Sequence, residues 1–215
     1  MKNLISIVLV CTLLCACDKE DNIDNVDYPI TLYAHELLRV SDVRLFINKN
    51  EIYDSDVIET FVGNYEFFKL PTTAEIQSSN ESICFLSRDS VLFGTTTIGF
   101  TVKKNAHQFL FYSPLIGPIN RFDEVVRPLL KYTDELVPVF LSDFEYLTRE
   151  VRVGYGSYRN IEISFLSYML SKNGDSFRQF IGGGLFNEFN EEGINTLQLR
   201  DTLAIRESKI RFIAK

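Results

Sequence analysis

The chain has 215 residues, of which 46% are hydrophobic and 13% aromatic, with 18 Phe, 10 Tyr and no Trp. That length fits one domain, or two small ones, with an ample core. The net charge is −7 at pH 7 and becomes −8 if the first sixteen residues, whose only charge is Lys2, are removed. This acidic balance argues against nucleic acid or an anionic membrane surface as a partner.

The first sixteen residues have the three parts of an export signal. Lys2 gives a positive start, residues 4–14 form an almost unbroken apolar run, and Ala16 is a small residue at its end. The run is much shorter than the roughly 20 apolar residues that cross a bilayer. We therefore expect a leader that is removed and not a permanent transmembrane helix.

The sequence Leu14-Cys15-Ala16-Cys17 resembles the lipobox of bacterial lipoproteins. That resemblance implies that Cys17 receives a thioether-linked diacylglycerol, that the chain is cut before it and that the new amine is acylated. Two or more acyl chains give stable anchoring, whereas one chain holds a protein only marginally. We expect a lipid anchor at Cys17; the alternative is an ordinary cleaved signal with a chance cysteine.

Residues 17–27 are acidic and contain no aromatic residue, which predicts a flexible tether behind the lipidated cysteine. Lys19, Glu20 and Asp21 are similar to the export signal of surface lipoproteins in the Bacteroidota. The resemblance implies a lipid anchor in the outer membrane with the domain displayed at the cell surface. The alternatives are display at the periplasmic face of that membrane, or a linker whose charges only stay solvated.

The cysteine count agrees with lipidation. Cys11 and Cys15 leave with the leader and Cys17 carries the lipid, so Cys84 is the only cysteine left in the domain, which we place at residues 28–215. An internal disulfide is therefore not expected. The domain must depend on its hydrophobic core, although export places it where disulfides are permitted.

The first part of the domain predicts strands and one helix. Three runs favour extended structure: 31–40, 43–47 and 51–53. Asp56 is a candidate helix N-cap because Glu59 stands three residues later, in the capping-box position. The apolar residues that follow Asp56 recur at helical spacing, and Gly63 can end the helix.

From residue 82 the sequence becomes rich in the aromatic and β-branched residues that favour strands. Four short runs are separated by turn residues: 82–86, 90–93, 95–102 and 107–112. This spacing predicts an antiparallel meander. The alternation within 95–102 places one face of that strand on the core and the other toward water.

The rest of the chain combines an irregular stretch with further strands. Residues 121–147 predict an irregular, partly helical excursion, because Pro128 interrupts an amphipathic pattern. Gly182–Gly184 predicts a bulge, a bend or a loose turn. The candidate strands after the excursion are 149–155, 161–171, 177–181, 202–206 and 209–213.

The potential metal ligands and nucleophiles do not form a recognisable site. His35 and His107, each in a predicted strand, have no Cys, Asp or Glu at a spacing typical of metal ligands. Cys84 has no basic neighbour in sequence to activate it, and we expect it to be a buried, inert thiol. We interpret Asp54 and Asp56 as turn and cap residues and not as paired catalytic carboxylates. We therefore predict no catalytic residue, no metal site and no cofactor.

Two further stretches contain residues that also occur in ligand-binding loops. Residues 187–193 resemble a calcium loop only loosely, lack the ligand spacing of an EF-hand and predict a solvated turn. Residues 154–158 lack the third glycine of a dinucleotide loop and predict a hairpin turn. The C-terminal third also holds aromatic residues that either form a binding face or, as we favour, fill the core: Tyr155, Tyr158, Phe165 and Tyr168.

These elements predict a mainly β fold, in which an antiparallel sheet forms a barrel or sandwich with one or two short helices. Residues 44–54 and 201–205 look like segments of uncharacterised Bacteroidota surface lipoproteins, a resemblance that brings no known activity. We expect a non-enzymatic binding or structural module at the cell envelope, with a protein or glycan partner unspecified. The alternatives are a lipocalin-like carrier of a small apolar ligand and a hydrolase with a dispersed acid pair.

Overall fold

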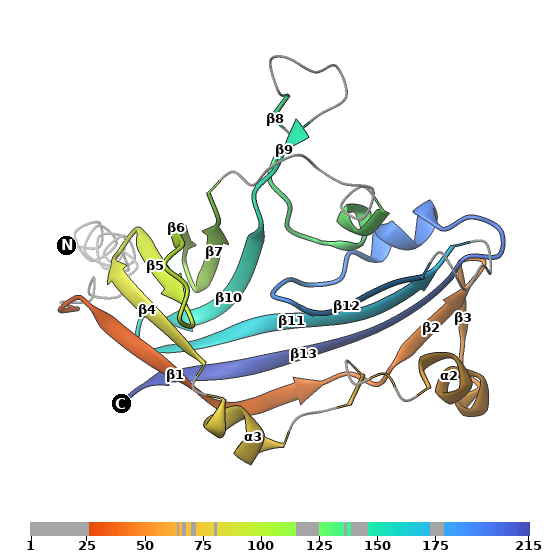
Figure 1. Cartoon of the computed structure of the whole chain (residues 1–215), viewed down its shortest axis with the longest axis horizontal. Coiled ribbons are helices and arrows are strands. Elements are labelled where there is room, and N and C mark those ends of the chain that lie inside the picture. Colours follow the sequence, from red (N-terminus) through yellow and green to blue (C-terminus); the bar gives the residue numbers. More distant parts are fainter. Residues whose placement is uncertain are drawn as a thin grey trace, which may run out of the picture.

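Eight antiparallel strands close into a barrel in the computed structural model (Figure 1). Their order around the barrel is β1-β4-β5-β6-β7-β10-β11-β13, and β13 returns to β1. Their bounds are Ile30–Val40 (β1), Ser82–Ser87 (β4), Ser90–Phe93 (β5), Gly99–Asn105 (β6), Gln108–Tyr112 (β7), Val151–Ser157 (β10), Asn160–Ser171 (β11) and Thr202–Ala214 (β13). The structure describes residues 26–63, 65, 68–69, 72–79, 81–114, 125–135, 137–138, 146–172 and 179–215.

Closure depends on the pairing of β11 with β13. The two strands are in register from Asn160 opposite Ile213 to Ser171 opposite Thr202. The predicted meander is confirmed, because β4, β5, β6 and β7 follow one another in the sheet as they do in the sequence. The predicted mainly β fold is therefore confirmed, and of the two predicted arrangements the structure has the barrel.

The interior of the barrel is filled by its own side chains. Phe109 has no exposed surface, and its ring centroid lies 5.9 Å from those of Phe85 and Phe111 and 5.1 Å from that of Tyr158. An eight-stranded barrel is just wide enough for side chains to fill. The other buried hydrophobic residues of this cluster are Leu32, Ala34, Ile76, Ile83, Val91, Phe93, Phe100, Val102, Ile161, Ile163, Ile210 and Phe212.

Tyr158 closes the end of the barrel at which the described chain begins. Its ring stands edge-on to those of Phe85 and Tyr28, with centroids 5.1 and 5.9 Å away. Its hydroxyl donates to the Arg88 carbonyl at 3.3 Å. Burial raises the pKa of Tyr158 to about 12. The described chain therefore begins at a closed, aromatic end of the barrel.

Arg152 closes the opposite end. It pairs with Phe111 across β10 and β7, so its side chain shares the inward face of that residue. Its guanidinium lies 4.5 to 4.6 Å from the ring centroids of Phe93, Phe100 and Phe186, and Glu150 binds it at 2.7 and 3.2 Å. Arg152 is half-buried, and a cation over aromatic rings is worth about 0.5–2 kcal/mol according to its exposure, so this residue helps to hold the end of the barrel closed.

The long strands β11 and β13 continue beyond the barrel as a second part of the sheet (Figure 1). There β12 (Gln179–Leu185) pairs with β11 on one side, and β2 (Arg44–Ile47) pairs with β13 on the other, followed by β3 (Asn50–Ile52). Leu166 pairs with Leu185 but Tyr168 with Gly182, so of the bulge, bend or loose turn predicted at Gly182–Gly184 the structure has a bulge, within a strand that continues past the predicted end at residue 181. A separate ribbon joins β8 (Val137–Pro138) and β9 (Tyr146–Leu147).

Both faces of this second part are covered. The helix α2 (Ser55–Val62) packs its Val62 with Leu45, Met169 and Ala204 on one face. The short 3₁₀ helices η2 (Arg127–Leu129) and η4 (Glu191–Thr196) lie on the other face, where Leu129, Phe189 and Leu197 meet a buried cluster of strand residues. Those strand residues are Phe46, Leu166, Tyr168, Leu170, Leu203 and Ile205.

Three local predictions require correction. The strand predicted at 95–102 begins only at Gly99, because residues 94 and 95 form a turn. The separate strands predicted at 202–206 and 209–213 are one strand, since Glu207 and Ser208 pair with β11 without interruption. The sequence analysis also missed the helix α3 (Thr73–Ser78), which packs Ile76 against the barrel core and is capped by Thr72 and Glu75.

The N-cap of α2 is Asp54, two residues before the predicted Asp56. Its Oδ1 atom accepts the backbone N–H groups of Asp56 and Val57 at 3.0 and 3.2 Å. Gly63 ends the helix at φ +52°, as predicted. Both aspartates could cap a helix in sequence terms, and the hydrogen bonds identify Asp54 as the cap, with Asp56 in the first turn.

Asp54→Ala is expected to lower the free energy of unfolding by about 1 kcal/mol, because two helix N–H groups lose their acceptor. Asp56→Ala is the matched control, since its side chain is exposed in the first turn and a charge there is worth only about 0.3–1 kcal/mol. Urea unfolding followed by circular dichroism measures both. A larger loss for Asp56→Ala than for Asp54→Ala would contradict the assigned cap.

Candidate functional site

A polar cleft lies on the outside of the barrel, where β11 and β13 leave it. The alternation along these strands turns Ser164, Glu207 and Lys209 away from the interior. The segment after β12 crosses this face and forms the opposite wall. The cleft has a volume of about 200 Å³ and is lined by Ser41, Ser164, Asn187, Glu188, Glu207, Ser208 and Lys209.

Asn187 fixes the crossing segment. It is buried, and its Nδ2 atom donates to the carbonyls of Tyr132 and Val151, each at 2.8 Å. Its Oδ1 atom accepts the N–H groups of Tyr132 and Glu188 at 3.2 and 2.8 Å. Because both ends of the amide are occupied, Asn187 holds the wall of the cleft and leaves ligand binding to its neighbours.

Glu188 is a half-buried carboxylate at the centre of a hydrogen-bond network. It accepts from Lys131 Nζ at 2.9 Å and from Ser164 Oγ at 3.1 Å. Burial raises the pKa of Glu188, but hydrogen bonds from Lys131 and Tyr155 outweigh it and hold the pKa below its ordinary value. The carboxylate is therefore ionised at neutral pH, and its bond raises the pKa of Lys131.

Two tyrosines extend this network along the outer face. The hydroxyls of Tyr132 and Tyr155 are 3.2 Å apart, and Gln108 Nε2 donates to them at 2.8 and 3.4 Å. Burial first, and then the contact with Tyr132, raises the pKa of Tyr155. Lys209 Nζ lies 4.5 Å from the centroid of the Tyr155 ring. The side of the cleft is therefore aromatic as well as hydrogen-bonding.

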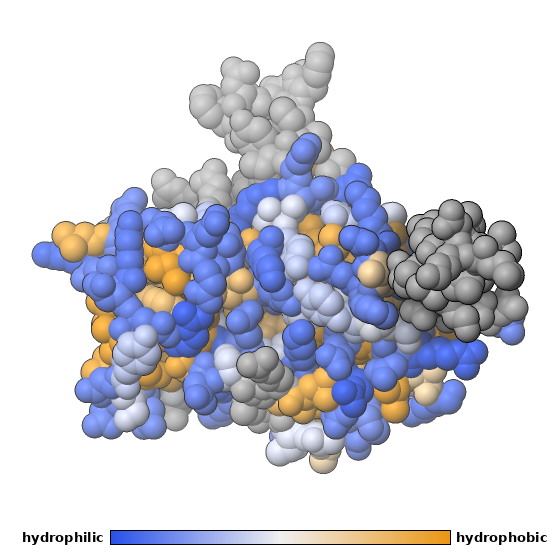
Figure 2. Space-filling view, turned by 180° about the vertical axis from the view of Figure 1, so that it is seen from behind, coloured by the Kyte–Doolittle hydropathy of each residue, from blue (hydrophilic) through white to orange (hydrophobic). Residues whose placement is uncertain are grey.

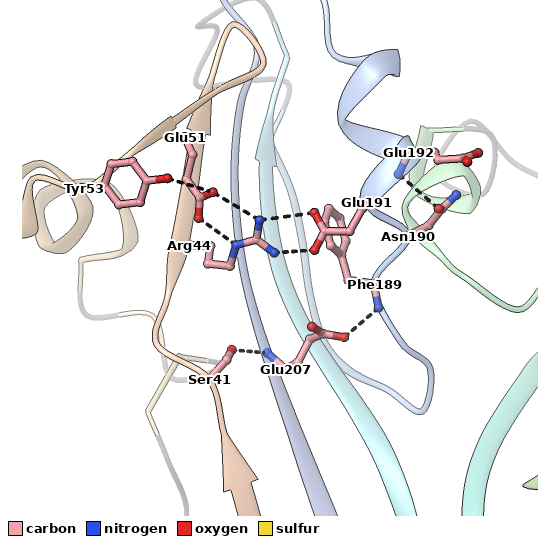
Figure 3. A network of polar contacts seen from close by, with 9 residues as sticks. All are labelled: Ser41, Arg44, Glu51, Tyr53, Phe189, Asn190, Glu191, Glu192 and Glu207. Carbon is pink, nitrogen blue, oxygen red and sulfur yellow. Dashed lines mark hydrogen bonds and ion pairs between the residues drawn. The ribbon is translucent and has the colours of Figure 1, made fainter.

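Glu207 joins the cleft to the second part of the sheet (Figure 3). Its Oε1 atom accepts the N–H of Phe189 at 3.0 Å, and its own N–H donates to Ser41 Oγ at 3.0 Å. These bonds connect β13, the crossing segment and the end of β1. They place the Glu207 carboxylate at the edge of the cleft, where it faces both the segment and the cavity.

Arg44 of β2 holds the start of η4, which follows the segment that crosses the cleft (Figure 3). Its guanidinium binds Glu51 of β3 at 2.8 and 3.3 Å and Glu191 of η4 at 2.5 and 3.2 Å. The bonds to Glu51 and then Glu191 raise the pKa of Arg44. Two carboxylates saturate this arginine, so it positions η4 over the sheet and has no free donor edge for a ligand.

A second, larger cavity lies between α2 and the sheet. It has a volume of about 690 Å³ and is mostly apolar. Apolar side chains also gather among hydrophilic ones at this end of the molecule (Figure 2). The cavity is lined by Leu45, Ile47, Asp54, Asp56, Val57, Thr60, Phe61, Gly63, Tyr65, Met169 and Thr202.

The predicted anchor residues Cys17, Lys19, Glu20 and Asp21 lie outside the described residues. His35 lies in β1, whereas His107 lies in the turn before β7 and not in a strand as expected. The described residues contain no group of three or more His, Cys, Asp or Glu side chains placed to hold a metal ion.

The aromatic residues singled out in the C-terminal third lie in two environments, because they are on different faces of the sheet. Tyr158 is buried in the barrel core and Phe165 packs against it, whereas Tyr168 is buried in the cluster beneath η2 and η4, so these three belong to the hydrophobic core as favoured. Tyr155 instead faces the cleft. Cys84 is a free cysteine on β4 and is half-buried, not fully buried as expected.

Sequence analysis did not identify this cleft. The alternation of side chains along β11 and β13 could have placed Ser164, Glu207 and Lys209 on one face of the sheet. No sequence pattern near Lys131 indicates that this residue binds Glu188 at the same face. The sequence predicts a solvated turn at 187–193, which includes Glu188. The loop 187–193 is not exposed throughout, because Asn187, Phe189 and Gly193 are buried.

The fold and site define a closed, filled β-barrel with an external polar cleft. Comparison with family models, with curated proteins and with solved structures found no match. Within the parts of the chain that the structure describes, no helix has the length and apolar character needed to cross a membrane.

Proposed function

We propose that the chain is a membrane-anchored extracytoplasmic lipoprotein that acts as a non-enzymatic binding module, with the polar cleft as its binding site. Lipid on Cys17 holds it in the outer membrane, and Lys19, Glu20 and Asp21 direct it to the cell surface; the periplasmic face is the alternative. The anchor is supported by the lipobox-like sequence, and the non-enzymatic role by the lack of a catalytic motif in it.

One observation carries the choice of site: the barrel interior is occupied by packed rings, while a hydrogen-bonded, ionised carboxylate lines a cavity outside it. Binding sites combine a concave surface with a few fixed polar groups and neighbouring aromatic surface. The cleft has these features in Glu188, Ser164 and Tyr155. The wall is fixed by Asn187, so the groups are already in place before a ligand arrives.

A screen of glycans, small polar metabolites and envelope fractions against the full chain, purified in detergent, tests this proposal. Glu188→Gln is expected to weaken the binding of a ligand about 10-fold or more, because a charge-assisted hydrogen bond is worth about 1.5–3 kcal/mol. Isothermal titration calorimetry measures the loss. Glu192→Gln is the control, since that side chain is exposed and the segment is bonded through its backbone.

Failure to bind any compound or fraction in these panels would count against a binding role. Binding that Glu188→Gln leaves unchanged would place the site elsewhere. The second candidate, a carrier of a small apolar ligand, is favoured by the apolar cavity beneath α2, which falls in the volume range of small-molecule sites. An apolar ligand bound equally by wild type and Glu188→Gln would favour that function.

A further inference from the structure

We infer that the cleft binds a small zwitterion with the chemistry of an α-amino acid, its carboxylate at Lys209 and its ammonium at Glu207. This inference rests on the proposed function and names the ligand of the same site. It comes from the two charged side chains that line the cleft and are not used by the fold in ion pairs.

Glu207 and Lys209 carry opposite charges on one face of β13. Among the described residues, neither makes an ion pair: Glu207 accepts one backbone N–H, and Lys209 lies over the Tyr155 ring. The other charged groups at this face are already matched, since Glu188 binds Lys131. Arg211, one step further along β13, binds Glu36 and Glu162. The cleft therefore presents one free anion and one free cation.

The spacing of the two groups suits a zwitterion. Residues two apart on a strand have Cα atoms about 6.8 Å apart. The nitrogen and the carboxylate carbon of an α-amino acid are roughly 2.5 Å apart, and two charge-assisted contacts of about 2.8 Å extend this to about 8 Å. The first distance joins Cα atoms and the second joins the charged ends of the side chains, and the flexible stem of Lys209 allows its ammonium to adopt the second distance from the Glu207 carboxylate.

The size and charge of the cleft argue against a neutral ligand. The cleft volume of about 200 Å³ lies below the roughly 300–1,000 Å³ of the pockets that hold drug-sized ligands. That is room for a small amino acid, and too little for an oligosaccharide to enter fully. A neutral sugar would also displace water from Glu207 and Lys209 without supplying a counter-charge to either, which is unfavourable.

Titration calorimetry of the full chain in detergent with each of the standard α-amino acids tests the inference. The tightest-binding amino acid is then compared with its methyl ester, its N-acetyl derivative and glucose. We expect both derivatives to bind about 10- to 100-fold more weakly, because each loses one charge-assisted contact. We expect glucose to bind more weakly than any of the amino acids that bind.

The variants assign each charge to its partner. In Lys209→Met the amino acid and its methyl ester should bind equally, because the carboxylate no longer has a cation to meet. In Glu207→Gln, which keeps an acceptor for Phe189, the amino acid and its N-acetyl derivative should bind equally. Lys103→Met is the control, since Lys103 lies over Tyr112 at 4.6 Å in the same kind of contact away from the cleft.

Unchanged affinity in Lys209→Met and Glu207→Gln would overturn the zwitterion. If a neutral sugar then bound to wild type and more weakly to Glu188→Gln, the proposed binding function would be supported and only the ligand class would be wrong. If no ligand of any class bound in a manner sensitive to Glu188, Glu207 or Lys209, the cleft would be rejected as the binding site. Thermal unfolding of each variant separates loss of binding from loss of fold.

Discussion

Phe109→Ala is expected to lower the free energy of unfolding by about 3–5 kcal/mol, the usual loss for a phenylalanine deleted from a core. The ring has no exposed surface and contacts Phe85, Phe111 and Tyr158 inside the barrel. Its removal leaves a cavity that three strand-held rings cannot collapse to fill. Urea unfolding followed by circular dichroism gives the difference.

Leu86→Ala is the control for this variant. Leu86 lies on β4 next to the buried Phe85 but is 46% exposed, so its truncation should change stability far less than that of Phe109. A loss below about 1 kcal/mol for Phe109→Ala would mean that the interior is loosely packed. Such a result would reopen the barrel as a site for an apolar ligand.

The strands of the barrel were predictable because their order is local. Residues 82–112 alternate with a period of two and are separated by short turns, so each strand pairs with the next one along the chain. Closure is not local. It requires β13 to pair with both β1 and β11, which lie far apart in sequence, and no pattern in residues 202–214 indicates two partners.

The length of β13 was not predicted, because the polar residues Glu207 and Ser208 were interpreted as a turn between two strands. In a half-buried strand such residues predict a turn, yet here they cross the point where the strand leaves the barrel and one face borders the cleft. The two polar residues that interrupt the hydrophobic pattern also line the cleft. A departure from the pattern within a long strand was therefore the available signal for function.

The two α-helices differ in how clearly the sequence indicates their N-caps. Thr72 followed by Glu75 is a capping box in the sequence, and both of its bonds are present at α3, which could have been predicted from it. The cap of α2 was ambiguous, because Asp54 and Asp56 stand two residues apart. Lys131 and Tyr132 could not be assigned to the site, since only the tertiary contact with residues 187 and 188 brings them there.

Cys17→Ala is expected to abolish acylation of the chain and its cleavage after Ala16. The thioether that carries the diacylglycerol forms on the cysteine sulfur, and in lipoproteins with this kind of signal cleavage follows that step. The variant should take up no labelled palmitate and should keep the leader's sixteen residues, which mass spectrometry detects. Wild type should partition with the membrane, because two or more acyl chains anchor a protein stably.

Cys84→Ala is the matched control, because Cys84 is a free cysteine on a barrel strand and lies in the folded domain. That variant should keep its palmitate and its cleaved N-terminus. Palmitate labelling that Cys17→Ala leaves unchanged would refute the anchor, whereas labelling lost only in Cys84→Ala would move it onto the barrel. The described chain begins at the closed end of the barrel beside Tyr28 and Tyr158, and neither residue lines the cleft or the cavity beneath α2, so an anchor attached before this point would leave both open to a ligand.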